Sequence, residues 1–223
     1  MRCFDCPIAV EINDHLITKA KRFSISVVPT VGSAGSGYRD TNQNNLQKIQ
    51  QDHYVGKVGE EAVRLAFQQF GNVVQGPDYT IYLNRQKSWD ADLYVNGIGL
   101  AVKTQTAAAA RRFGLSWTFQ SGTHRQDPIL NKPESWVCFV KFDEQNHQCM
   151  VYPPYQIKEL TFGEPKLEKL KGHKRVVYGE SLPSLSVTGD RPVAIQNKEL
   201  PHSPKELPHS PEAIAPELWH GMN

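Results

Sequence analysis

An Asn-Gly dipeptide inside an otherwise strand-like segment most constrains the fold of this chain. The segment, residues 90–105, reads DADLYVNGIGLAVKTQ. Asn96 and Gly97 favour a two-residue β-hairpin turn because both residues tolerate a positive φ angle. If they make the turn, Val95 pairs with Ile98, and the segment becomes two antiparallel strands in a defined register.

This register sorts the side chains of the hairpin onto two faces, because successive residues of a strand point to opposite sides. The apolar face carries Leu93, Val95, Leu100 and Val102. The polar face carries Asp90, Asp92, Ala101 and Lys103. Two interpretations are open: a surface hairpin with an ordinary ion pair between Asp90 and Lys103, or a site where two carboxylates and an amine act together.

The residues before the hairpin are helical in pattern from Asn44 to Phe70, and Gly71 suits the end of such a helix. Glu61 falls on the apolar stripe of this helix, where a carboxylate is unfavourable unless a charged group meets it. A metal ion or the Lys103 amine is the expected partner; the alternative is a stripe-edge position that reaches water. Solvent is expected on the face that carries Lys57, Glu60, Arg64 and Gln68.

The remaining pattern completes a mixed α/β domain. Helices are expected over residues 8–20 and 156–171, and a helix or a loop over 107–114. Strands are expected over residues 72–82, 90–95, 98–104, 135–143, 148–153 and 174–179. This order of elements predicts a mixed central sheet flanked by helices.

Three regions differ in composition. Residues 1–43 form an N-terminal extension that ends in a Gly- and Ser-rich loop, and residues 44–183 form the core domain. Residues 184–223 contain the sequence KELPHSP twice, at 198–204 and 205–211. Two prolines in each repeat exclude a continuous helix, so a disordered C-terminal tail is expected.

Composition and charge limit the class of protein. Apolar residues make up 39% and charged residues 22% of the chain, which is typical of a globular protein. No apolar run approaches the ~20 residues of a membrane span, and the N-terminus lacks the pattern of a secretory signal. A cytoplasmic protein without a membrane segment is expected. The net charge of +2 permits nucleic-acid binding without requiring it.

The four cysteines leave two interpretations open. Cys3 and Cys6 form a C-x-x-C pair, but Cys138 and Cys149 lack the spacing of a zinc knuckle. Reduced, mostly buried thiols are the expected state, and a zinc-stabilised binding module is the alternative.

The helix and the hairpin together resemble the PD-(D/E)xK nuclease superfamily, which has the restriction-endonuclease-like fold. That pattern places a glutamate on the first core helix, an aspartate at the entry of a β-hairpin and an acid-x-lysine on the next strand. GEEA matches it with Glu61, DADL with Asp92 or Asp90, and AVK with Lys103. The resemblance covers residues 54–106. The acid expected two residues before the lysine is replaced here by Ala101, and Asp90 is the first candidate to replace it.

The resemblance implies a metal-dependent endodeoxyribonuclease of the restriction or homing type. Asp92, Asp90 and Glu61 are the expected ligands of Mg²⁺, for which Mn²⁺ can substitute. Lys103 is expected to orient or deprotonate the attacking water or to stabilise negative charge, and Gln105 to orient the water or the metal. Asp92 is the favoured principal ligand because the following leucine matches the usual pattern.

DNA is the expected partner, and a homodimer would match a two-fold symmetric target. Arg111 and Arg112 are expected to contact phosphates, while Ser116 and Gln120 line the groove. A further basic stretch carries Lys166, Lys169, Lys171, Lys174 and Arg175. Trp117 and Trp136 are expected in the core.

Two further functions remain open: a non-catalytic DNA-binding protein with a decayed nuclease fold, supported by Ala101, and a structure-specific nuclease of junctions or repair.

Overall fold

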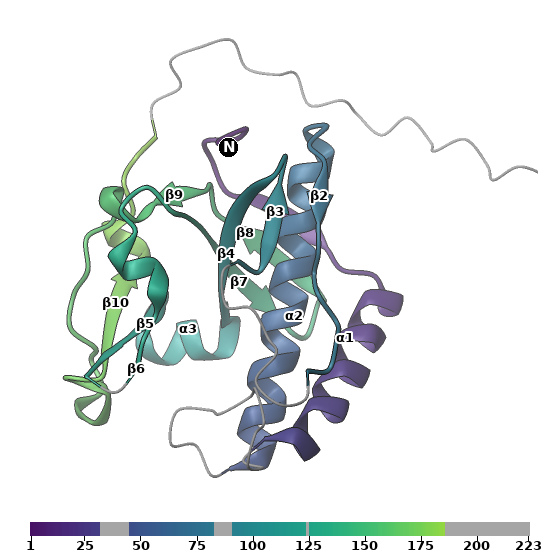
Figure 1. Ribbon diagram of the computed structural model, residues 1–223, viewed down its shortest axis with the longest axis horizontal. Helices are drawn as coiled ribbons and strands as arrows, with labels where there is room; N and C mark the ends of the chain where they lie inside the picture. The colour runs from purple at the N-terminus through teal and green to yellow at the C-terminus, as the bar shows by residue number, and fades with distance from the viewer. Residues whose placement is uncertain (32–44, 83–90, 124, 186–223) are drawn as a thin grey trace, which may run out of the picture.

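The computed structural model describes residues 1–31, 45–82, 91–123 and 125–185. A seven-stranded mixed sheet forms the centre of the molecule, with α1 and α2 on one face and a small three-stranded sheet on the other (Figure 1). The prediction of a mixed α/β fold, with helices flanking a mixed central sheet, is confirmed. The predicted tail, residues 186–223, lies outside the described residues.

Three α-helices and five short 3₁₀ helices occur in the described part of the chain. The α-helices are α1 (Asp14–Val27), α2 (Leu46–Gln69) and α3 (Ala107–Phe113). The 3₁₀ helices are η1 (Val28–Thr30), η2 (Pro128–Asn131), η3 (Ile157–Glu159), η4 (Glu168–Leu170) and η5 (Gly179–Ser181).

The strands form two sheets. The large sheet has the order β1-β8-β7-β4-β3-β2, with β9 also paired to β7. It contains β1 (Ile8–Glu11), β2 (Val74–Gln75), β3 (Leu93–Val95), β4 (Ile98–Thr106), β7 (Trp136–Asp143), β8 (Gln148–Val151) and β9 (Tyr155–Gln156). The small sheet contains β5 (Ser116–Gly122), β6 (Arg125–Gln126) and β10 (Lys174–Tyr178). Strands β4 and β7 are parallel, and the other pairs are antiparallel.

The predicted hairpin is confirmed in turn and register. Val95 pairs with Ile98 and Leu93 with Leu100. Asn96 and Gly97 have φ angles of 48° and 80°, the positive values that this turn requires. The Asn96 side chain also accepts a hydrogen bond from the Val73 amide at 2.9 Å, which ties the turn to the chain before β2.

Helix α2 also follows the sequence pattern. It ends at Gln69, and Gly71 then adopts a left-handed conformation with a φ of 73°. The Gly71 amide donates to the Gln68 carbonyl at 3.0 Å, and the Asn72 amide to the Phe67 carbonyl at 3.3 Å. These two bonds are the Schellman arrangement that glycine favours at a helix end.

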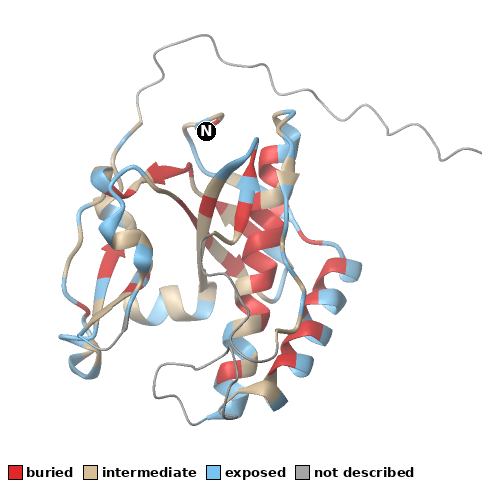
Figure 2. Ribbon diagram, in the orientation of Figure 1, coloured by how far each residue is buried: buried red, intermediate tan, exposed pale blue. Residues whose placement is uncertain are grey.

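The large sheet separates the two larger clusters of the apolar core, and a third, small cluster contains Phe23 and Val27. Buried residues lie along α2 and in the strands of the large sheet (Figure 2). Alternate residues of β4 and β7 face α2, with Leu100 and Val140 among them, and pack in the larger cluster. Their neighbours Ala101 and Phe139 face the small sheet. Trp117 of β5 is fully buried there, as predicted, and its indole N–H donates to the Val140 carbonyl at 2.9 Å.

Several expected elements have different bounds. Residues 8–20 contain β1 followed by α1, because the Asn13 side chain accepts from the Leu16 amide and starts the helix there. Residues 72–82 contain only the short strand β2, and of the two alternatives for residues 107–114 the helix forms, as α3. The basic stretch 156–171 contains 3₁₀ turns instead of an α-helix. Pro165 lacks an amide donor, and Gly163 pairs with Val176 of β10, so a helix there is interrupted.

The prediction that Glu60 and Lys57 face solvent is wrong. Both are buried, with 8% and 6% of their surfaces exposed, and they form an ion pair with each other. The Lys57 ammonium lies 5.2 Å from the ring centroid of Phe23 in α1 and 5.5 Å from that of Tyr79. Helix α1 and the Tyr79 segment therefore cover a face of α2 that the sequence pattern leaves open.

Residues 1–31 contribute to the same core as the residues that follow. Strand β1 pairs with β8, and α1 packs along α2. No helix in the described segments is long and apolar enough to cross a membrane.

Tyr54 of α2 makes the free energy of unfolding depend on pH in the alkaline range. Burial is the main cause that raises the pKa of Tyr54 to about 12, with charge from Glu144 adding to it. A tyrosine of an unfolded chain titrates near pH ~10. The unfolded chain therefore loses this proton first, and the free energy of unfolding falls as pH rises from about 10 to about 12.

We expect Tyr54→Phe to reduce this fall, because phenylalanine keeps the ring contact with Phe142 but has no proton to lose. Tyr155, whose pKa is also raised to about 12 by burial, retains its own share of the effect. Urea unfolding of both proteins at pH values from about 9 to about 11 measures the slope. Equal slopes for wild type and variant would contradict the assignment to Tyr54.

Candidate functional site on the face of β4

Asp92 is held against the backbone of β4. Its carboxylate Oδ2 accepts a hydrogen bond from the Val102 amide at 2.8 Å, while its own amide donates to the Leu100 carbonyl at 3.2 Å. Because β3 begins only at Leu93, the Val102 amide of β4 has no backbone partner in β3, and the Asp92 carboxylate accepts its hydrogen bond. This contact places Asp92, half-buried, beside the residue that precedes Lys103 in the chain.

Lys103 extends from β4 toward the small sheet. Its Nζ lies 2.8 Å from Oδ2 of Asp127 and 5.0 Å from the ring centroid of Phe119. The same Asp127 oxygen accepts from the Gln120 amide at 3.2 Å. The sequence interpretation missed Asp127, because it lies 24 residues after Lys103 and no local spacing connects the two.

Gln105 connects β4 to the start of β5. Its Nε2 donates to the Gly114 carbonyl at 3.1 Å and to Ser116 Oγ at 3.3 Å, and its Oε1 accepts from the Ser116 amide at 2.9 Å. The side chain therefore shares the face of Lys103, as predicted. Its amide groups are used to hold the β4–β5 connection in place.

Glu61 lies on the opposite side of the large sheet. Its side chain is 2% exposed, and its Oε2 lies 2.6 Å from Arg64 Nε. Its Oε1 accepts from the Tyr79 hydroxyl at 3.0 Å and lies 3.7 Å from Lys19 Nζ. The burial predicted for this carboxylate is confirmed, but its cationic partners are Arg64 and Lys19 instead of Lys103. Its role as a metal ligand stays a prediction.

The buried Glu61 carboxylate contributes to a raised pKa of the Tyr79 hydroxyl. Burial, followed by the negative charge of Glu61 and the hydrogen bond to it, raises the pKa of Tyr79 far above its ordinary value. The Lys19 ammonium also lies 4.0 Å from the Tyr79 ring centroid. Glu61, Tyr79 and the two cations thus form a closed polar network between α1 and α2.

The carboxylates available for a metal are few within the described ranges. No group of three or more His, Cys, Asp or Glu side chains there could hold a metal ion. Asp90 lies outside those ranges. Mg²⁺ commonly uses one or two carboxylates and keeps several waters, so a donor set of Asp92 and Asp90 is compatible with it.

The residues predicted to contact DNA lie in α3, which connects β4 to β5, and in β5 itself. Arg111 and Arg112 occupy the last turn of α3 and are exposed. Ser116 and Gln120 lie in β5 and are half-buried. An open cavity of about 340 Å³ lies further along the small sheet, lined by Ser121, Gln126, Leu130, Glu164, Gly172, Lys174 and Arg175. None of the four residues predicted to contact DNA lines it.

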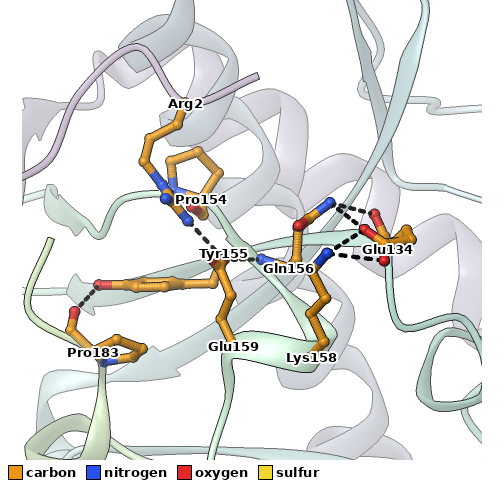
Figure 3. A network of polar contacts seen from close by, with 8 residues as sticks. All are labelled: Arg2, Glu134, Pro154, Tyr155, Gln156, Lys158, Glu159 and Pro183. Atoms are coloured by element: carbon orange, nitrogen blue, oxygen red, sulfur yellow. Dashed lines mark hydrogen bonds and ion pairs between the residues drawn. The ribbon is translucent and has the colours of Figure 1, made fainter. Parts of the chain in front are cut away.

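A second polar network lies where β7 begins (Figure 3). Lys158 Nζ lies 2.7 Å from Glu134 Oε2, and both side chains are largely exposed. Arg2 Nη2 lies 2.6 Å from Glu159 Oε2, while its Nε donates to the Pro154 carbonyl at 3.1 Å. These contacts join the N-terminal segment to the β9–η3 turn. The Glu134–Lys158 pair resembles the Asp127–Lys103 pair in length but is more exposed.

The four thiols differ in access. Burial raises the pKa of Cys138 and of Cys149 well above the ordinary value, and the Cys138 thiol also donates to the Tyr152 carbonyl at 3.0 Å. Cys6 is exposed and Cys3 is half-buried. Burial of the thiols is thus confirmed for Cys138 and Cys149, while Cys6 is exposed.

We expect an aromatic disulfide reagent to modify Cys6 rapidly and Cys3 more slowly in the native protein, and Cys138 and Cys149 only after unfolding. The physical reason is that the thiolate is the reactive form and that burial disfavours it. Absorbance of the released thiolate counts the modified groups, with denatured protein as the control. Rapid reaction of all four cysteines before unfolding would contradict this assignment.

Comparisons of the chain with protein-family models, curated proteins and solved structures find no match.

Proposed function

We propose that the chain is a metal-dependent endodeoxyribonuclease of the restriction or homing type. The observation that carries the proposal is the Asp92 carboxylate, held by the Val102 amide next to the residue that bears the candidate catalytic amine, Lys103. An acid at the entry of a hairpin and a lysine on its second strand form the arrangement implied by the resemblance to PD-(D/E)xK nucleases.

The order of elements supports the same proposal. Helix α2 precedes β2 and the β3–β4 hairpin, and α3, β5, β6 and η2 then lead to β7, which lies parallel to β4. A helix with a glutamate followed by a hairpin with the acid and the lysine is the order that the resemblance implies. The restriction-endonuclease-like fold is part of the proposal.

The chemistry assigned to each residue follows from charge. Mg²⁺ held by Asp92 and Asp90 would lower the pKa of a bound water and offset charge on the scissile phosphate. The Lys103 amine orients that water or stabilises the negative charge that develops on the phosphate. Gln105 holds β4 and β5 together so that the amine keeps its position.

DNA, a homodimer and a cytoplasmic location complete the proposal. Arg111 and Arg112 are exposed at the end of α3 and would contact phosphates from there. Ser116 and Gln120 would then approach the substrate from β5. A homodimer would present two such sites to a two-fold symmetric target.

Incubation of purified protein with a mixture of plasmid and phage DNAs tests this function. Parallel reactions contain Mg²⁺, Mn²⁺ or EDTA, and gel electrophoresis separates the products. Discrete bands that require metal are the expected result. A metal-dependent smear, or cleavage of branched DNA alone, would favour a structure-specific nuclease instead.

A non-catalytic DNA-binding protein is the second candidate, and Ala101 is the observation that favours it. Alanine cannot bind a metal at the position where the resemblance places an acid. This candidate predicts DNA binding that persists in EDTA, measured by gel retardation, with no cleavage of any substrate. Metal-dependent cleavage by the same preparation would exclude it.

A further inference from the structure

Asp127 is the carboxylate that meets Lys103. Its Oδ2 lies 2.8 Å from the lysine Nζ, and the two side chains are 22% and 26% exposed. The pair is therefore better shielded from water than most surface ion pairs, which contribute little. Phe119 covers the amine from one side, with its ring centroid 5.0 Å away.

Asp127 is itself fixed by β5. The Asp127 amide donates to the Gln120 carbonyl at 2.9 Å, and the Gln120 amide donates to Asp127 Oδ2 at 3.2 Å. These reciprocal bonds hold the backbone and the carboxylate in one orientation. Pro128 follows at once and begins η2, which restricts the chain further.

Position 101 of β4 offers the Lys103 amine no acidic partner. The Ala101 side chain packs in the apolar cluster facing the small sheet and carries no charge. An amine on a flexible four-carbon stem needs a partner to keep one position. On the face of β4, Asp127 is that partner, and it lies in the chain between β6 of the small sheet and η2.

We propose that Asp127 is a positioning residue that holds the Lys103 amine at the candidate site. The catalytic part of this inference rests on the nuclease function proposed above. Cleavage then depends on the small sheet, because β5 and η2 present the carboxylate. The placement of the amine itself does not depend on any activity.

A pulse of acetic anhydride without DNA tests the placement, with mass spectrometry to measure the rate at which each lysine is acetylated. In Asp127→Asn the amide oxygen still accepts from Gln120, but the ion pair is lost. We expect acetylation of Lys103 to become about 2- to 5-fold faster, the factor corresponding to a single ion pair. Asp127→Glu keeps the charge and is expected to keep the rate near that of wild type.

Glu134→Gln is the matched control, because Glu134 pairs with Lys158 at 2.7 Å in a separate network. It should accelerate acetylation of Lys158 and leave Lys103 unchanged. An unchanged rate at Lys103 in Asp127→Asn would overturn the placement. Circular dichroism shows whether Asp127→Asn folds. If it does not, acetylation of Lys103 is measured in folded Asp127→Glu instead. A wild-type rate of acetylation supports the placement, and a rise to the rate of Lys158 overturns it.

Cleavage kinetics then test the positioning role. For Asp127→Asn we expect kcat to fall about 10-fold with KM for DNA unchanged, and Asp127→Glu to recover part of kcat. A rise in KM alone would overturn the role. If the wild type cleaves no DNA while Lys103 acetylation still responds to Asp127→Asn, the proposed nuclease function fails and the placement of the amine stands.

Discussion

An Asp92→Asn variant is expected to cleave DNA at least about 100-fold more slowly than wild type, and Lys103→Ala to lose a similar factor. Asp92→Asn removes the carboxylate charge that is proposed to hold Mg²⁺. Lys103→Ala removes the amine that is proposed to orient the water or to stabilise the negative charge that develops on the phosphate. Asparagine retains an oxygen that can accept from the Val102 amide, so the hairpin contact at 2.8 Å is preserved. The loss therefore reports on the carboxylate charge rather than on folding.

Single-turnover cleavage in Mg²⁺ measures these rates, with two matched substitutions as controls. Asp52→Asn removes an exposed carboxylate that pairs with Lys48 on α2, and Lys158→Ala removes an exposed amine. Both controls should cleave at the wild-type rate. Full activity in Asp92→Asn and in Lys103→Ala would show that the site is elsewhere. Loss in the controls as well would indicate damage to the fold.

A Gly59→Ala variant is expected to lose about 3 kcal/mol of unfolding free energy, at the upper end of the usual range for overpacking. An added Cβ would lie 1.8 Å from Thr104 Oγ1 and 2.9 Å from Thr104 Cβ. Alanine favours a helix over glycine by only about 1 kcal/mol, so the clash dominates. Helix α2 must therefore move away from β4, the strand that carries Lys103.

Gly56→Ala, in the same helix, is the control for this prediction. Apart from the chain neighbours and the backbone of α2, no atom of the described residues lies within 4 Å of a Cβ added there, so a gain of up to about 1 kcal/mol is expected. Urea unfolding of both variants gives the two free energies. Thr104→Ala in the Gly59→Ala background should recover part of the loss, because the Oγ1 and Cγ2 contacts disappear. A stable Gly59→Ala variant would contradict the close approach of α2 and β4.

Local patterns predicted the elements whose cause lies within a few residues. Asn96 and Gly97 were sufficient for the turn, and the period of two then sorted Leu93 and Leu100 onto the face that packs under α2. Gly71 similarly predicted the end of α2. The apolar stripe of that helix also predicted the burial of Glu61.

Contacts between distant elements decided the rest. Glu60 and Lys57 are buried because α1 and Tyr79 cover them, which no periodicity within α2 reveals. Besides Arg64 in the same helix, Glu61 meets Lys19 of α1, although the sequence pattern suggested a metal ion or Lys103. Partner choice depends on where other segments come to lie, and that information is absent from the spacing within one element.

The candidate site depends both on a local sequence pattern and on a contact between distant segments. The sequence alone determined that Asp92 and Lys103 belong to one hairpin, because a two-residue turn and strand alternation leave a single register. Only the tertiary structure decided that Lys103 meets Asp127, since the carboxylate follows β6 of the other sheet, 24 residues later in the chain. Local geometry sets which face a side chain takes, and packing of the sheets sets what it meets there.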